Sequence, residues 1–231
     1  MSQHNKNEKW LPKPVHVLEQ YLEQFLAPIE GFESDQCRGM RKNIAYSLQH
    51  LEFISYCLSE INTTSVIYTQ NIKTFIIVSC SVIEALFFYL LRSKNKFKTT
   101  CWQPSKKLSG QEFKDSDGKT KRVDIEIFEK TSLRYKEMNF DSMCKSIQTG
   151  KIIKFENDDF FKNLNYLRKI RNRIHVHIIK NSSDTDYLKI NYSDYNLAKG
   201  VLSSLMTSEL FSNPRHDLFE YLKIIEISDP F

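Results

Sequence analysis

Glycine and proline are scarce in this chain, with six of each among 231 residues. A chain with so few turn-forming and helix-breaking residues is neither collagen-like nor a low-complexity disordered protein. Its length allows one domain to bury a core without crosslinks or structural metals. We therefore predict a folded globular protein in which most residues belong to regular structure.

The cysteines and the N-terminal residues argue against a disulfide- or zinc-stabilised protein and against an exported one. The five cysteines are odd in number, widely spaced and never in a CxxC pair, so we predict neither a disulfide framework nor a zinc site. The first ten residues, MSQHNKNEKW, lack the apolar run of a signal peptide. We expect a cytoplasmic protein with reduced thiols.

Several short enzyme motifs are absent as well. The sequence contains no GxSxG, P-loop, HExxH or dinucleotide-binding glycine pattern. The string from Asp115 to Gly118 lacks the later ligands and the closing glutamate of a calcium loop. We therefore expect no cofactor and no metal site.

One apolar run, residues 74–91, is long enough to be considered as a membrane span. Glu84 lies within it, and an ionised carboxylate would be costly in lipid. A helix buried on most sides inside a bundle explains the run better, so we predict that the protein does not span a membrane.

Helical periodicity dominates the chain and predicts an all-α fold, an antiparallel helical bundle. We treat residues 1–231 as a single domain in which residues 1–33 are an N-terminal extension. A possible strand lies at residues 187–191. The expected helices cover residues 15–26, 34–61, 65–93, 140–149, 157–177, 193–210 and 217–225.

The helical pattern fails in residues 94–130, which we interpret as an insertion that forms a basic loop or a small β-hairpin. Val123, Ile125 and Ile127 alternate with polar residues after the Asp117-Gly118 turn, as in a hairpin strand. Residues 92–122 hold ten lysines or arginines against three acids. Such a charge run is usually a solvated surface, although it can also attract phosphates.

Residues 164–180, LNYLRKIRNRIHVHIIK, contain the candidate site. In an α-helix at ~100° per residue, Arg168, Arg171, Asn172 and His175 share one face, whereas His177 points elsewhere unless the helix loosens. Metal-free RNA cleavage needs a group that moves protons and a cation beside the phosphate, and histidine and arginine provide them. Basic residues near a helix C-terminus are also favoured by the helix dipole alone, and most histidines on such faces are simply packed.

The segment LRKIRNRIHVH resembles the signature of the HEPN superfamily, an arginine, often followed by asparagine or another polar residue, that is separated from a histidine by roughly four to six residues. Arg171 to His177 leaves five intervening residues and Arg168 to His175 leaves six, so either histidine fits. The resemblance implies a helical-bundle endoribonuclease of toxin–antitoxin or antiviral defence systems that acts on RNA as a homodimer. Arg171 would hold the scissile phosphate, Asn172 would orient it, and His175 or His177 would move the proton.

The same resemblance leaves other functions open. An antitoxin or another defence-system protein is an expected partner of an active member, whereas inactive members bind RNA or protein without cleavage. A structural subunit of a larger assembly, docked through residues 92–122, is a third hypothesis.

Glu84 completes the candidate site. An acid in an apolar helix needs a cationic partner, and Arg168 or Arg171 would provide one. Glu84 either aligns the motif arginine for catalysis or forms a structural ion pair with it.

Overall fold

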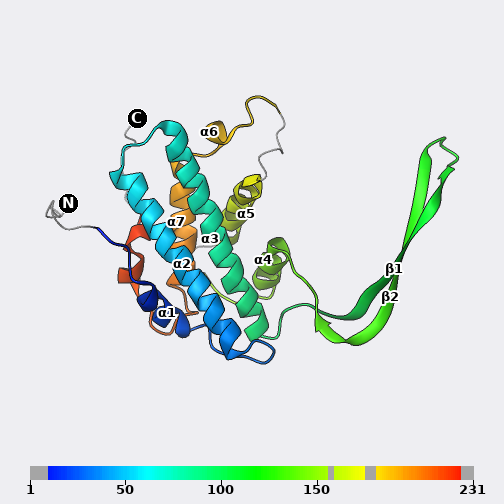
Figure 1. The fold of residues 1–231 in the computed structure, drawn as a ribbon, viewed down its shortest axis with the longest axis horizontal. Coiled ribbons are helices and arrows are strands. Elements are labelled where there is room, and N and C mark those ends of the chain that lie inside the picture. Colours follow the sequence, from blue (N-terminus) through cyan, green and yellow to red (C-terminus); the bar gives the residue numbers. More distant parts are fainter. Residues whose placement is uncertain (1–9, 156–158, 175–180, 225–231) are drawn as a thin grey trace.

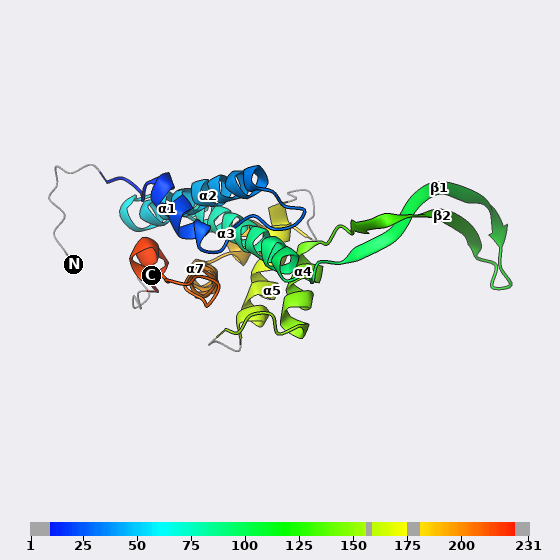
Figure 2. The ribbon, with the colours of Figure 1, turned by 90° about the horizontal axis from the view of Figure 1, so that it is seen from below.

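The computed structural model describes residues 10–155, 159–174 and 181–224. Helices form the body of the protein, and a long two-stranded arm projects from one end of it (Figure 1). A second view, in Figure 2, shows the same arm extending well beyond the helices.

Helix α3 (Ser65–Ser93) is the central element of the body. By length and composition alone it could cross a membrane, but 61% of its most apolar window is buried inside the protein. The prediction of a buried bundle helix accounts for this apolar run, and α3 resembles the core helix of a soluble protein. Its neighbours are α2 (Ser34–Glu60), α4 (Phe140–Thr149), α5 (Phe160–Arg171), α6 (Asp186–Lys189) and α7 (Tyr192–Met206).

Helix α1 (Val15–Glu23) and the 3-10 helix η2 (His216–Leu222) also pack against α2. Tyr21 stacks on Phe211 with ring centroids 4.6 Å apart and meets the edge of Phe219 at 5.3 Å. Thus part of the segment expected as an N-terminal extension contributes buried side chains to the core.

Local hydrogen bonds fix where several helices begin. At the start of α7, the Asp194 amide donates to Asn191 Oδ1 (3.2 Å), and the Asn191 amide donates to Asp194 Oδ2 (2.9 Å). This reciprocal pair satisfies two backbone donors that a helix N-terminus leaves free. Asn139 caps α4 in a similar way, since its side chain accepts from the Ser142 amide at 2.9 Å.

The prediction of an all-α fold is wrong, because the arm makes the protein a mixed α/β structure. Strands β1 (Thr99–Lys114) and β2 (Thr120–Tyr135) each contain 16 residues and pair antiparallel. The region expected as a basic loop or a small hairpin is therefore a long ribbon. In β1 the alternation is hidden by Pro104, Gly110 and two shifts in register, one between Pro104 and Lys106 and one between Ser109 and Glu112, which break the period of two that identifies a strand.

The arm has an ordered turn and an ordered root. At the turn, the Gly118 amide donates to the Asp115 carbonyl at 2.8 Å, and Gly118 adopts a positive φ of 72° that favours glycine. At the root, the Arg92 guanidinium lies 3.4 Å from the centroid of the Tyr135 ring and donates to the Gly31 carbonyl at 2.7 Å. These contacts attach the arm to the end of α3.

Two smaller expectations also need correction. The segment expected as a strand at residues 187–191 begins instead with the short helix α6. The α-helix expected over residues 157–177 ends at Arg171 and continues as a 3-10 turn, η1 (Asn172–Ile174). The tighter 3-10 winding changes the angular positions of residues that follow Arg171.

Candidate functional site

Apolar packing holds the motif helix in place. Leu164, Leu167 and Ile170 are buried on α5 and face the interior of the bundle, where α5 contacts α3 and α7. This arrangement leaves Arg168 and Arg171, three residues apart and therefore neighbours on the helix surface, at the edge of the buried region.

Arg171 forms an ion pair with Glu84 of α3, with 3.0 Å between Nη2 and Oε2. This contact confirms the prediction that Glu84 is paired with one of the two motif arginines. The side chains are 35% and 27% exposed, respectively, so the pair is open to solvent on one side. Glu84 restrains the guanidinium while part of it stays accessible to a ligand.

Arg168 has a different partner, Asp141 in the first turn of α4, at 2.6 Å. A hydrogen bond from Lys145 lowers the pKa of the Asp141 carboxyl, and the charge of Arg168 acts in the same direction. The two arginines therefore have separate carboxylates. Asp141 was not identified from the sequence, because nothing in its neighbourhood indicates a contact with α5.

Two buried thiols, Cys80 and Cys144, lie in the electrostatic field of these arginines. Burial raises the pKa of each thiol to about 12, although the nearby arginines oppose the shift. Both thiols stay protonated at neutral pH and are unsuited to act as nucleophiles, which require the thiolate form.

Arg173 belongs to a second network of ion pairs, which lies beyond the end of α5. It contacts Asp184 at 2.8 Å and Asp186 at 3.3 Å, and Asp186 also binds the buried Lys73 of α3 at 2.6 Å. Burial alone would raise the pKa of Asp186, but the hydrogen bond from Lys73 contributes to holding it below its ordinary value. This network ties α6 to α3 and occupies Arg173.

Of the three remaining candidate site residues, the structure describes only Asn172. Asn172 directly follows Arg171 and is exposed as the first residue of η1. His175 and His177 lie outside the described residues. The structure thus brings together Glu84 and Arg171, places Asn172 beside them in the chain, and gives Arg168 to a separate pair.

The basic stretch around α5 is divided between two faces of the helix. Lys162 and Lys169 line a surface cavity of about 590 Å³ together with Tyr166. In a regular helix these lysines lie on the side opposite Arg171. The motif arginines therefore form ion pairs on one surface, while the two lysines lie on another, where Lys162 contacts Asp159 at 3.3 Å.

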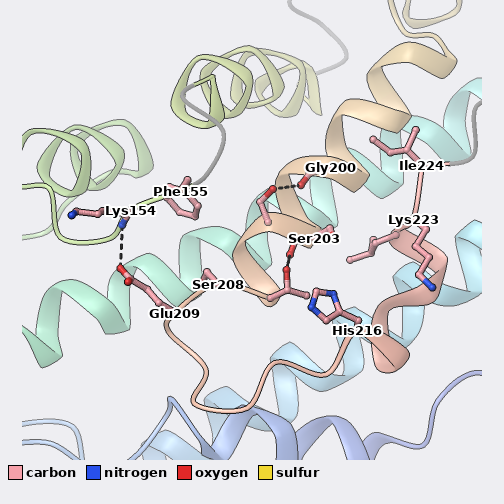
Figure 3. Close-up of a pocket in the computed structure, with 12 residues that line it drawn as sticks. Lys154, Phe155, Gly200, Ser203, Ser208, Glu209, His216, Lys223 and Ile224 are labelled. Carbon is pink, nitrogen blue, oxygen red and sulfur yellow. Dashed lines mark hydrogen bonds between the residues drawn. The ribbon is translucent and has the colours of Figure 1, made fainter.

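A cavity of about 730 Å³ lies at the end of α7, between η2 and the loop that carries Lys154 (Figure 3). Its hydroxyl groups are used locally: Ser204 donates to the Gly200 carbonyl at 2.9 Å and Thr207 to the Ser203 carbonyl at 2.8 Å. None of the four predicted site residues that the structure describes, Glu84, Arg168, Arg171 and Asn172, lines this cavity. We therefore do not assign the candidate chemistry to it.

Within the part of the chain that the structure describes, no group of three or more histidine, cysteine, aspartate or glutamate side chains could hold a metal ion. Comparisons with protein-family models, curated proteins and solved structures found no match for this chain. The resemblance to the HEPN superfamily therefore depends on the motif residues themselves.

Proposed function

We propose that this protein is a metal-independent endoribonuclease of the HEPN type, a cytoplasmic toxin or antiviral effector that cleaves RNA. The observation that carries the proposal is the Glu84–Arg171 ion pair at the C-terminal end of α5. It restrains a partly exposed guanidinium beside Asn172, in the segment that resembles the HEPN signature. A restrained cation can stabilise charge on a phosphate without reorganising during the reaction.

The proposed reaction is an internal transesterification. The ribose 2′-oxygen attacks the adjacent phosphorus and loses its proton, the bond to the 5′-oxygen breaks, and that oxygen receives a proton. Arg171 binds the phosphate and Asn172 orients it, while His175 or His177 moves the proton. The products have a 2′,3′-cyclic phosphate and a 5′-hydroxyl.

Two proton transfers require more groups than one α5 segment supplies. We propose that a homodimer provides them, because a two-fold axis near α5 would bring two copies of the motif to one substrate. Restraint of a toxin of this kind by an antitoxin or another defence partner is part of the same proposal.

The test is RNA cleavage in EDTA by the wild type, Arg171→Ala, His175→Ala and His177→Ala. We expect Arg171→Ala and one histidine variant to lose at least about 100-fold in rate, as expected for a group that binds or protonates the reacting phosphate. Lys169→Ala is the matched control, because it removes a basic side chain from the same helix on the opposite face. Equal loss in the control would indicate a general effect of charge instead.

A non-catalytic RNA- or protein-binding module is the second candidate. Its support is that carboxylates already pair with Arg168, Arg171 and Arg173, which limits the cations free to act on a substrate. RNA affinity that falls with salt and is unchanged in the His175→Ala and His177→Ala variants, in a folded protein without cleavage, would favour this candidate.

A further inference from the structure

The two faces of the arm differ in chemistry. Residues that lie opposite each other in an antiparallel pair share a face, and successive residues of one strand alternate. Val123, Ile125 and Ile127 of β2 therefore lie on one face, together with Leu108, the register partner of Ile125. Phe113, the partner of Lys121, extends the same face toward the turn.

The opposite face is charged in the distal half of the arm, whereas nearer the root it carries the exposed Phe128 and Trp102. Arg122, Asp124 and Glu126 alternate with the apolar residues of β2, and Arg122 binds Asp124 at 3.0 Å. Lys107 is the register partner of Glu126 and carries the opposite charge. An antiparallel sheet with one apolar and one charged face is the usual pattern of a sheet that is packed on one side and solvated on the other.

In the described structure nothing covers the apolar face. Val123, Ile125 and Ile127 are 57%, 55% and 41% exposed, and the arm projects away from the helices in both views (Figures 1 and 2). A two-stranded ribbon is only marginally stable in water without packing on one face. Contiguous exposed apolar residues of this kind mark an interaction surface.

The order of charges on this face indicates what covers it. Along β2 the face reads Lys121, Val123, Ile125, Ile127 and Glu129, with a cation at one end of the apolar stripe and an anion at the other. Within each arm Lys121 also binds Asp115 at the turn, and Glu129 accepts a hydrogen bond from Ser105. An ammonium has three donors and a carboxylate has several acceptor sites, so both groups can take a further partner. A second copy laid antiparallel on this face, with Ile125 on the two-fold axis, places Val123 over Ile127. The same rotation places Lys121 of each copy beside Glu129 of the other, so the stripe is complementary to itself.

We propose that the arm is a self-association element, in which the apolar faces of two arms pack against each other in antiparallel orientation about Ile125. Burial of the stripe drives the contact, and the Lys121–Glu129 pairs at its ends fix its direction. Lys106, the partner of Ile127, lies at the margin of the same face, where its charged end can stay in water. The interface is small, so we expect a dissociation constant on the order of micromolar.

This contact is independent of the proposed nuclease activity. The distal arm lies far from α5 in both views (Figures 1 and 2), and the antiparallel arrangement places the two helical bodies at opposite ends of the paired arms. A dimer formed through α5 would be a second, separate contact. The test below measures mass and leaves cleavage aside.

Sedimentation velocity over a concentration series, with variants in which the charges at residues 121 and 129 are reversed, tests whether the arms form this dimer. We expect the wild type to dimerise, and Lys121→Glu and Glu129→Lys each to weaken the dimer at least about tenfold because both rim pairs become repulsive. The double variant and an equimolar mixture of the two single variants restore opposite charges in both intermolecular pairs and should restore the dimer, although the Lys121–Asp115 contact within an arm stays broken wherever residue 121 is glutamate. Recovery in the mixture also shows that both single variants are folded.

Two further variants complete the design. Ile125→Lys should abolish the contact, whereas Leu133→Lys, at an exposed apolar residue outside the stripe, should leave it unchanged. A wild type that stays monomeric up to about 100 µM would overturn the proposal, since a contact weaker than this has no role as a specific interface. Equal behaviour of the single, double and mixed samples would overturn it too, as would an Ile125→Lys variant that dimerises as strongly as the wild type.

Discussion

At the scale of single residues, the ion pair with Glu84 restrains the position of the Arg171 guanidinium. The pair is about one-third exposed, so its contribution to the free energy of unfolding is about 0.5–1 kcal/mol. If Glu84 aligns Arg171 on the phosphate, Glu84→Gln should lower the cleavage rate at least about tenfold while the melting temperature falls by only a few degrees. Cleavage rates and thermal unfolding of the same preparation measure both effects.

Asp141→Asn is the control for this prediction, because it breaks the neighbouring ion pair with Arg168 and leaves Arg171 untouched. Its cleavage rate should stay near that of the wild type. Unchanged cleavage in Glu84→Gln would reduce the Glu84–Arg171 pair to a structural contact.

A second residue, Lys199, allows a prediction about pH. Its side chain on α7 is buried beneath the ring of Tyr195, and burial lowers its pKa to about 8. The unfolded chain keeps this proton until about pH 10.5, whereas the folded chain releases it near pH 8, so the free energy of unfolding rises between these values.

Replacing Lys199 with methionine removes the buried charge and keeps an aliphatic chain of similar length. We expect Lys199→Met to raise the free energy of unfolding by about 1–3 kcal/mol at pH 7, and this gain should shrink as the pH approaches 10. Urea unfolding at both pH values measures the difference. Lys42→Met, at an exposed lysine of α2, should have little effect at either pH; a stabilising effect of the same size there would contradict the explanation.

At the residue scale the sequence predicted the Glu84 contact because a carboxylate in an apolar helix requires a cation nearby. It did not predict the partners of Arg168 and Arg173. Asp141, Asp184 and Asp186 lie in short polar segments whose positions in space depend on how α4 and α6 pack against the bundle. Local patterns do not contain that information.

At the scale of elements, the long helices followed from periodicity and the arm did not. The apolar residues of α2, α3 and α7 recur with a helical period, and polar residues mark their ends. In the arm only the part of β2 from Thr120 to Lys130 keeps a regular alternation, while two shifts in register disrupt it in β1. The sequence therefore indicated a hairpin but not its length, which is set by pairing between two strands whose distal parts contact mainly each other.

The arm should be separable from the body. Removing residues 105–127 and joining Pro104 to Phe128, which are register partners, through an Asn-Gly turn retains the root contacts. We expect the shortened protein to keep its helical circular dichroism and to melt within about 3 °C of the wild type, because the distal strands contact mainly each other.

The same shortened protein should sediment as a species with no arm-mediated dimer. Loss of the helical signal would show that the arm supports the fold of the bundle, contrary to the arrangement described above.

At the scale of the whole molecule, the basic charge is spread over separate surfaces. The net charge is +5, but the motif arginines are paired with acids, while Lys162 and Lys169 lie on the opposite face of α5. RNA bound only by general attraction would therefore contact the lysines and the arm more than Arg171. Cleavage that depends on Arg171 more than on Lys169 would identify a specific site.

The chemical nature of the ends formed from a defined RNA by the wild-type protein in EDTA is the most direct test of the proposed function. We predict 2′,3′-cyclic phosphate and 5′-hydroxyl ends, produced by the wild type and lost in a folded Arg171→Ala variant purified in parallel. Ends with a 3′-hydroxyl and a 5′-phosphate, cleavage that persists at full rate without Arg171, or no cleavage by the folded wild type would contradict the account.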